Sequence, residues 1–306
     1  MDEEIIKSIF SHYRLSPATN VKKIDVGFTN DVYDVDDSYI LKVCKGAKCE
    51  PFFRHEALLY RHFWSTLPVP KVVAFDDTRE FHDRYFLIYR KIHGDNLYNV
   101  WHTFSEKQRK DIIHQLCGFL RMITETDLST LPEGVLLEDV PDWKAHVLQR
   151  LSHSLNAAQT AGTISRDETE RVKRFVAQHG SCLDEQKIGL TYWDAHFDNI
   201  IVRDAQIVGL LDFERTGLAS IDYMLDIVRR MIEFPKKYMS EYAEQFARSE
   251  DYQHLMEWYK EFYPELFDFT DIDRRLDLYS IEHDLRDLKE WPNVASLKEN
   301  ILKIAS

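Results

Sequence analysis

The sequence predicts a two-lobed α/β (α+β) fold, in which a small antiparallel β lobe precedes a large, mostly helical lobe. Short apolar runs of β type, separated by turn-forming residues, are concentrated in the first third of the chain. Amphipathic periodicity typical of helices dominates the remainder. We therefore expect a β lobe over residues 1–92 and a helical lobe over residues 93–306, connected by a hinge at about 89–94.

The β lobe is expected to open with a short amphipathic helix, because Ile5, Ile6, Ile9 and Phe10 fall on one face. Breaks rich in turn formers then divide the chain into strands. The expected elements are a helix over 3–14, three strands within 21–43 with breaks at 27–31 and 36–38, a helix over 52–63, and strands over 71–75 and 85–89.

In the second lobe, the clearest helical pattern places Ile112, Leu116, Phe119 and Ile123 on one face. The expected helices lie over 105–126, 143–157, 166–179, 222–233, 239–247, 252–262 and 272–290. Two apolar runs flank a polar turn in the middle of this lobe, so residues 200–211 predict a β-hairpin that turns at 203–206.

The composition describes an acidic globular protein. Of 306 residues, 44% are hydrophobic and 30% are charged, and the net charge is −13. A nucleic-acid partner is not expected, because neutralising phosphates needs a basic surface. The acidic balance is compatible with a cationic small molecule, although most of these charges are expected on solvated helix faces.

The four cysteines, Cys44, Cys49, Cys117 and Cys182, match no zinc or redox spacing and are expected to be reduced thiols. The first residues are acidic where a signal peptide would be basic. No apolar run approaches the roughly 20 residues that span a bilayer. We expect a cytoplasmic protein with no membrane partner.

Three polar residues interrupt apolar β-type runs in the middle of the chain. Asn199 follows Asp194 by five residues, and Asp212 follows Asn199 by thirteen. If the intervening hairpin folds back, these side chains come together. Phosphoryl transfer needs a carboxylate to orient the attacking hydroxyl and oxygen ligands to hold Mg²⁺ on the phosphates. The spacing is suited to that chemistry.

This pattern resembles the aminoglycoside phosphotransferase and choline kinase family, whose members share the protein-kinase-like fold. The resemblance implies that Asp194 is the catalytic aspartate, and that Asn199 and Asp212 are ligands of Mg²⁺. The family usually has His-Gly before this aspartate, whereas this chain has Tyr192 and Trp193. We therefore expect different packing and hydrogen bonding around the loop.

Lys42 lies in an apolar strand, on the same face as Ile40, and precedes Glu56 by fourteen residues. A lone strand lysine is usually a solvent or edge residue. This order, however, resembles the family's strand lysine, which grips the nucleotide phosphates and pairs with a helix glutamate. We expect that pair to be Lys42 and Glu56, with Glu50 as a rival for the glutamate.

Two further segments are expected to contact the nucleotide, which can be ATP or GTP. The turn containing Gly27, Thr29 and Asn30 can place backbone amides over phosphates, because glycine allows close approach, although an ordinary hairpin turn would look the same. By the resemblance, Tyr89 lies near the gatekeeper position, and the segment from Arg90 to Ile92 lies along the base edge.

The resemblance implies a kinase that phosphorylates a hydroxyl of a small molecule. Only nine residues separate Asp212 from Asp222, which is too short for the activation segment of a protein kinase. A cationic acceptor such as an aminoglycoside is expected, with a choline-like amino alcohol or a sugar as the alternative. The protein is expected to be a monomer or homodimer.

Acidic residues of the last predicted helix are open to two interpretations. In the family, carboxylates in this region receive cationic substrates. From their spacing, Glu282, Asp284 and Asp287 are more typical of a salt-bridged surface helix.

Two other functions remain open at this point. One is a nucleotide-binding pseudoenzyme of the same fold, suggested by Tyr192 and Trp193. The other is a metal-dependent hydrolase, because Asp194, His196 and Asp198 would share one face of a strand.

Overall fold

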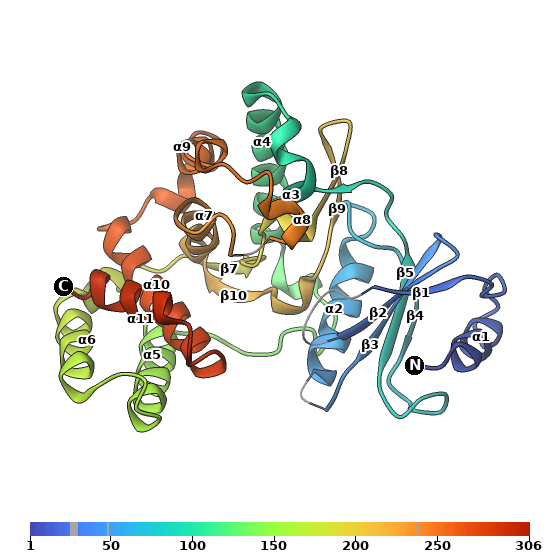
Figure 1. Ribbon diagram of the computed structural model, residues 1–306, viewed down its shortest axis with the longest axis horizontal. Helices are drawn as coiled ribbons and strands as arrows, with labels where there is room; N and C mark the ends of the chain where they lie inside the picture. Colours follow the sequence, from blue (N-terminus) through green and yellow to red (C-terminus); the bar gives the residue numbers. More distant parts are fainter. Residues whose placement is uncertain (25–29, 48, 238) are drawn as a thin grey trace.

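The computed structural model describes residues 1–24, 30–47, 49–237 and 239–306, and it shows two lobes (Figure 1). The β lobe is an antiparallel sheet of five strands in the order β1-β2-β3-β5-β4. These strands are β1 (Val21–Ile24), β2 (Asn30–Val35), β3 (Tyr39–Cys44), β4 (Val72–Asp76) and β5 (Phe86–Arg90).

Two helices cover the sheet on opposite sides (Figure 1). Helix α1 (Glu3–His12) buries Ile6, Ile9 and Phe10 in a cluster with the outer face of the sheet. Helix α2 (Glu50–Phe63) lies on the side that faces the helical lobe, and its buried residues belong to the core of that lobe. Helix α2 is therefore the structural bridge between the lobes.

The second lobe is mostly helical and surrounds two small sheets. The helices are α3 (Leu97–Val100), α4 (Glu106–Thr124), α5 (Trp143–Thr160), α6 (Arg166–His179), α7 (Met224–Glu233), α8 (Glu241–Glu244), α9 (Leu255–Phe262), α10 (Ile272–Glu290) and α11 (Ala295–Ile304). The strands are β6 (Asp95–Asn96), β7 (Ile188–Thr191), β8 (Ile200–Arg203), β9 (Gln206–Leu210) and β10 (Gly217–Ser220). Strands β6, β8 and β9 form one sheet, and β7 and β10 form the other.

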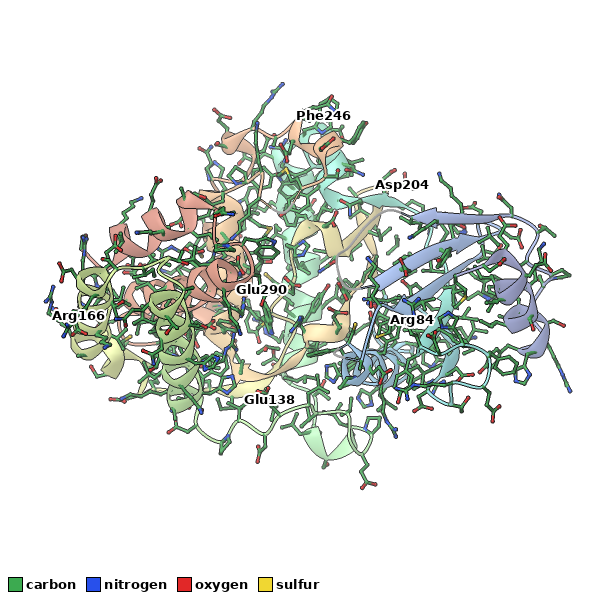
Figure 2. All side chains as sticks on the ribbon, turned by 60° about the horizontal axis from the view of Figure 1, so that its bottom comes forward. Arg84, Glu138, Arg166, Asp204, Phe246 and Glu290 are labelled. Carbon is green, nitrogen blue, oxygen red and sulfur yellow. The ribbon has the colours of Figure 1, made fainter. Side chains whose placement is uncertain are left out.

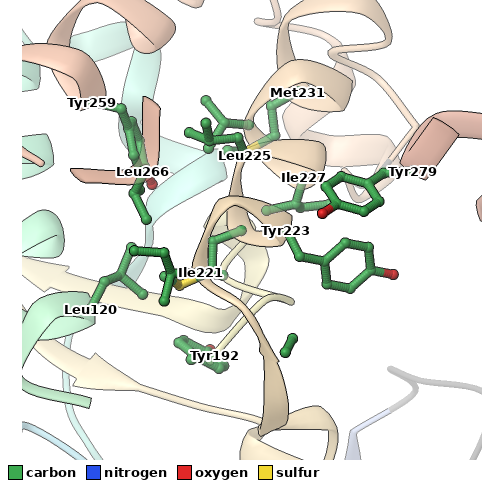
Figure 3. Packing of buried hydrophobic residues seen from close by; sticks show 14 of the residues in the cluster. Leu120, Tyr192, Ile221, Tyr223, Leu225, Ile227, Met231, Tyr259, Leu266 and Tyr279 are labelled. Atoms are coloured by element: carbon green, nitrogen blue, oxygen red, sulfur yellow. The ribbon is translucent and has the colours of Figure 1, made fainter. Parts of the chain in front are cut away.

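Local signals explain where several helices begin. Ser105 and Gln108 form a reciprocal capping box at the start of α4, and Ser165 and Glu168 form another at the start of α6. Further along, α7 lies in the middle of the core, with Tyr259 and Leu266 on one side and Tyr279 on the other (Figure 3). This packing places α7 between α9 and α10.

Most predicted elements are present, with ends shifted by a few residues. The hairpin at 200–211 is confirmed as β8 and β9. The predicted helix over 239–247 is reduced to the single turn of α8, and α9 begins at Leu255 instead of residue 252. Helix α11 was not predicted. Its buried side consists of Leu297, Asn300 and Ile301, which fall on one helical face.

The interpretation of α10 as a salt-bridged surface helix is wrong. Its acidic residues are buried: Glu282 is 2% exposed, and Asp284 is 1% exposed. Helix α10 packs against α5, α7 and α11 together, so these carboxylates meet basic partners from other helices. Glu282 accepts from Arg150 at 3.1 Å, and Asp284 accepts from Arg230 at 2.8 Å.

None of the four cysteines forms a disulfide. Among the helices that the structure describes, none has the length and apolar character needed to cross a bilayer.

Candidate active site between the lobes

A cavity of about 430 Å³ lies between the sheet of the β lobe and the β8–β9 hairpin. Predicted site residues from both lobes line it: Asn30, Lys42, Glu56, Tyr89, Ile92, Asn199 and Asp212. Arg90 does not line it, because its exposed guanidinium lies over the Tyr39 ring, 4.3 Å from the centroid. Gly27 and Thr29 lie outside the described residues.

Lys42 is the centre of a buried charge cluster. Its ammonium donates to Glu56 at 2.8 Å, to Asp212 at 3.1 Å and to Glu214 at 3.4 Å. Burial by itself would lower the pKa of Lys42, but the three carboxylates together raise it well above its ordinary value. The ammonium therefore stays charged. The rival Glu50 lies elsewhere, in an ion pair with Arg79.

Glu214 is a member of this cluster that sequence reasoning did not single out. It is 7% exposed and accepts from the Asn30 amide at 3.3 Å as well as from Lys42. Glu214 could have been noticed, because it is the last residue of the Leu-Asp-Phe-Glu segment. A short segment of sequence, however, does not show which distant residues a side chain contacts. One ammonium among three carboxylates leaves negative charge uncompensated, which favours the binding of a cation.

Asp194 lies in the loop between β7 and β8, and a hydrogen bond within this loop stabilises it. The Asn199 amide nitrogen donates to the backbone carbonyl of Asp194 at 2.9 Å. The Asp194 carboxylate is 26% exposed and lies 3.6 Å from His196 Nε2. Burial and the nearby Asp212 raise the pKa of Asp194, although His196 opposes them, and a raised pKa makes the carboxylate a better proton acceptor.

The strand that a metal-dependent hydrolase would require is absent from the described loop. Residues 193–196 form a turn and irregular backbone, and Phe197–Asn199 is a 3₁₀ turn. Asp194, His196 and Asp198 therefore do not share a strand face. Among the described residues, the acidic group with suitable spacing is instead Glu56, Asp212 and Glu214, which surrounds Lys42.

Tyr192 explains how the loop accommodates its departure from the family pattern. Its hydroxyl donates to the carbonyl of Leu211, and its ring stacks on Phe213 with centroids 4.6 Å apart. Both contacts flank Asp212, whose backbone is left-handed at φ 55° and ψ 60°. The Asp212 amide donates to the Tyr60 hydroxyl at 2.8 Å. Two tyrosines therefore hold Asp212 in a conformation that is uncommon for residues other than glycine.

The hinge segment connects the two lobes at the edge of the cavity. The Arg90 and Lys91 amides donate to the carbonyls of Lys71 and Ser38. Ile92 and Gly94 follow and line the cavity. A Cβ at Gly94 would lie 2.6 Å from the Val202 carbonyl oxygen, so only glycine permits this contact between the hinge and β8.

Comparison with known proteins agrees with this geometry. Residues 20–262 match the model of the phosphotransferase enzyme family. No curated protein was found to match the sequence significantly.

Among solved structures, the chain is similar to the aminoglycoside phosphotransferase APH(2'')-Ib bound to ADP. The TM-score is 0.72 at 16% identity, covering 100% of this chain and 97% of the other. It is also similar to the GDP and kanamycin complex of APH(2")-IIia, with a TM-score of 0.72 at 14% identity, covering 99% and 97%. A thermostable APH(4)-Ia mutant in complex with AMP-PNP and hygromycin B gives a TM-score of 0.68 at 14% identity, covering 98% and 97%.

These similarities confirm the expected two-lobed, protein-kinase-like fold. Because the family model matches most of the chain, the protein belongs to the phosphotransferase enzyme family and is a phosphotransferase with an alcohol group as acceptor.

Proposed function

We propose that the protein transfers the γ-phosphate of ATP or GTP to a hydroxyl of a small molecule. The observation that carries this proposal is the buried cluster of Lys42, Glu56, Asp212 and Glu214, next to a loop that presents Asp194. The similar solved structures hold ADP, GDP or AMP-PNP, which supports a purine nucleotide in the cavity between the lobes.

The cavity offers separate surfaces for the parts of a nucleotide. Apolar side chains from both lobes line it and would enclose the base: Val32, Ile40, Ile201 and Leu211. Because the Arg90 and Lys91 amides are already bonded, we assign the base edge to the backbone at Ile92, beside Tyr89. Lys42 would bind phosphate oxygens, and we also assign Gly27, Thr29 and Asn30 to the phosphates.

The donor set fits Mg²⁺, which prefers oxygen ligands. Asn199 uses its amide nitrogen to bind the Asp194 carbonyl, which leaves its side-chain oxygen as the atom that can hold a metal. Asp212 supplies a carboxylate in the same cavity. We therefore assign Asn199 and Asp212 to Mg²⁺, which would neutralise phosphate charge when bound.

Asp194 then acts on the acceptor. The acceptor oxygen forms a bond to the γ-phosphorus while the bond from that phosphorus to the β–γ bridging oxygen breaks, releasing the nucleoside diphosphate. The hydroxyl proton passes to the Asp194 carboxylate. Lys42 stabilises charge on the phosphates, and a cation held by Asn199 and Asp212 would add to this effect. Positioning and electrostatics would thus supply most of the rate enhancement.

For the acceptor, aminoglycosides are the first candidates to test, because kanamycin and hygromycin B occupy similar structures. Choline-like amino alcohols and sugars are the alternatives. We place the enzyme in the cytoplasm as a monomer or homodimer, in keeping with four cysteines that form no disulfide.

The decisive experiment measures nucleotide binding and acceptor-dependent nucleoside diphosphate release with Mg²⁺. The Asp194→Asn variant should lose about 10²–10⁴-fold in turnover, while nucleotide affinity changes little. Asp204→Asn is the control, because Asp204 is exposed in the turn between β8 and β9 (Figure 2). Failure of the wild type to bind ATP and GTP would refute the proposal, and nucleotide binding without any turnover would favour a pseudoenzyme.

A further inference from the structure

A second cavity, of about 340 Å³, opens beside the first at the base of the β lobe. It is formed by the connection between α4 and α5, one side of α5, the segment after Asp212 and the first turn of α2. Figure 2 marks Glu138, which lies on that connection and forms part of the rim. This volume suits a small organic molecule.

The second cavity adjoins the catalytic residues. Trp193, next to Asp194 in the chain, lines it, and so does Glu214, which accepts from Lys42 at 3.4 Å. Arg215 also lines it, and its charge acts on the Asp194 carboxylate. A molecule in this cavity would therefore lie beside the loop that carries Asp194 and beside Glu214, which contacts Lys42.

Aromatic rings form much of its wall. The Tyr223 ring lies 5.0 Å from the Trp143 ring and 5.6 Å from the Trp193 ring, centroid to centroid, and Phe52 lies across from them on α2. Leu136 and other aliphatic residues extend the apolar surface. Such walls favour an acceptor with an apolar, ring-containing body over a fully hydrophilic one.

Arg150 brings a guanidinium group to the wall of this cavity. Arg150 lines the cavity and pairs with Glu282 at 2.9 Å, but Glu282 also lies 3.6 Å from Arg286. Arg150 therefore shares its carboxylate with Arg286, which is also near Asp287. The Glu282 side chain is 3% exposed and does not line the cavity, whereas the Arg150 side chain is 31% exposed. His146 Nε2, 3.4 Å from Arg150 Nη1, helps to orient the guanidinium.

The acidic residues of the cavity do not offset this charge. The carboxylate of Glu214 is bonded to Lys42 and Asn30. Glu138 is 70% exposed at the rim, where water screens it. An ammonium group placed deep in the cavity would thus meet the Arg150 guanidinium without a carboxylate to receive it.

We propose that the acceptor of this enzyme is a hydroxyl compound with an apolar, ring-containing body and a carboxylate or phosphate that binds Arg150, rather than a polycation. This inference rests on the proposed function of the same site, and it replaces the aminoglycosides named there as first candidates with an anionic class of acceptor. The anionic group would form a charge-assisted pair with the planar guanidinium at one end. The hydroxyl at the other end would face Asp194.

Three matched probes test the class of acceptor: a hydroxymethyl-naphthoate, the corresponding carboxamide and the corresponding aminomethyl compound. They share a ring and a hydroxyl and differ in charge. Calorimetric titration of the enzyme with a nucleoside diphosphate and Mg²⁺ should show the carboxylate binding about tenfold more tightly than the carboxamide, with the amine weakest. Equal or tighter binding of the amine, or no binding of the carboxylate, would overturn the inference.

The Arg150→Gln variant should abolish the preference for the carboxylate and leave the affinity for the carboxamide nearly unchanged. Arg121→Gln is the matched control, because Arg121 is 32% exposed and pairs with Glu265 at 3.0 Å outside the cavity. A preference retained in Arg150→Gln would contradict the assignment. Nucleotide affinity, measured separately, distinguishes the two proposals: its absence refutes the kinase function, whereas normal nucleotide binding with the wrong probe order refutes only the acceptor class.

Discussion

Tyr192 shows how one residue can preserve a site while departing from its family's sequence pattern. Its hydroxyl holds the Leu211 carbonyl, and its ring supports Phe213, so it fixes both neighbours of Asp212. Asp212 needs this support because its left-handed backbone is unfavourable for a residue with a Cβ. The departure at Tyr192 is therefore compatible with an assembled metal site, and it does not by itself indicate a pseudoenzyme.

We predict that Tyr192→Phe lowers turnover more than nucleotide affinity, because it loosens Asp212 without removing it. The partly buried Leu211 carbonyl would lose its donor, which should cost about 1 kcal/mol of unfolding free energy. Denaturant unfolding and steady-state kinetics measure the two effects. Tyr242→Phe, at a position 58% exposed, should change neither. Unchanged stability in Tyr192→Phe would show that the hydroxyl does not hold the loop.

At the scale of single elements, buried charges attach α10 to its neighbours. Asp226 of α7 accepts from Arg230 at 3.1 Å and lies 2.8 Å from His283 Nδ1 of α10. His283 is buried, and burial together with Arg230 and Arg286 lowers its pKa to about 3, although Asp226 opposes this shift. The imidazole is therefore neutral in the folded protein and donates from Nδ1 to Asp226.

This arrangement predicts a specific loss of stability in acid. The unfolded chain protonates His283 near its ordinary pKa of 6.5, whereas the folded chain resists protonation down to about pH 3. The free energy of unfolding should thus fall as pH decreases from about 6.5 towards 3, by several kcal/mol at most. His283→Gln keeps a donor and should flatten this dependence, as measured by urea unfolding from pH 7 to pH 4. Identical slopes in both proteins would contradict the assignment.

The elements also show what could be predicted from sequence. Helices α4 and α6 have local starts, in the capping boxes at Ser105 and Ser165, and strong periodicity, so they were predictable. One partner of Lys42 was predictable, because a strand lysine and the helix glutamate that follows it lie close together in the sequence. The burial of α10 was not, since its carboxylates are neutralised by arginines from α5 and α7. The role of Glu214 was not predictable either, because its partners lie far away in the sequence, on β2 and β3.

Across the whole molecule, the active site is also the junction of the lobes. Lys42 and Asn30 belong to the β lobe, whereas Asp212 and Glu214 belong to the helical lobe. On α2, His55 Nε2 lies 2.6 Å from the Thr216 carbonyl oxygen. Charged and polar contacts therefore hold the lobes together around the cavity. A ligand that bridges the same groups should strengthen the junction, and with it the folded state.

We therefore predict that ATP or GTP with Mg²⁺ raises the melting temperature, and that this shift depends on Lys42. A ligand at a hundred times its dissociation constant stabilises the folded protein by about 2.7 kcal/mol, which corresponds to a shift of several degrees in a chain of this size. In Lys42→Met, the carboxylates lose their cation and the phosphates lose their lysine, so the nucleotide-induced shift should largely disappear. Lys107→Met, at a side chain 85% exposed, should retain it. Because the comparison uses the difference with and without nucleotide, lower intrinsic stability of Lys42→Met does not obscure the result. An equal shift in wild type and Lys42→Met would place the nucleotide elsewhere.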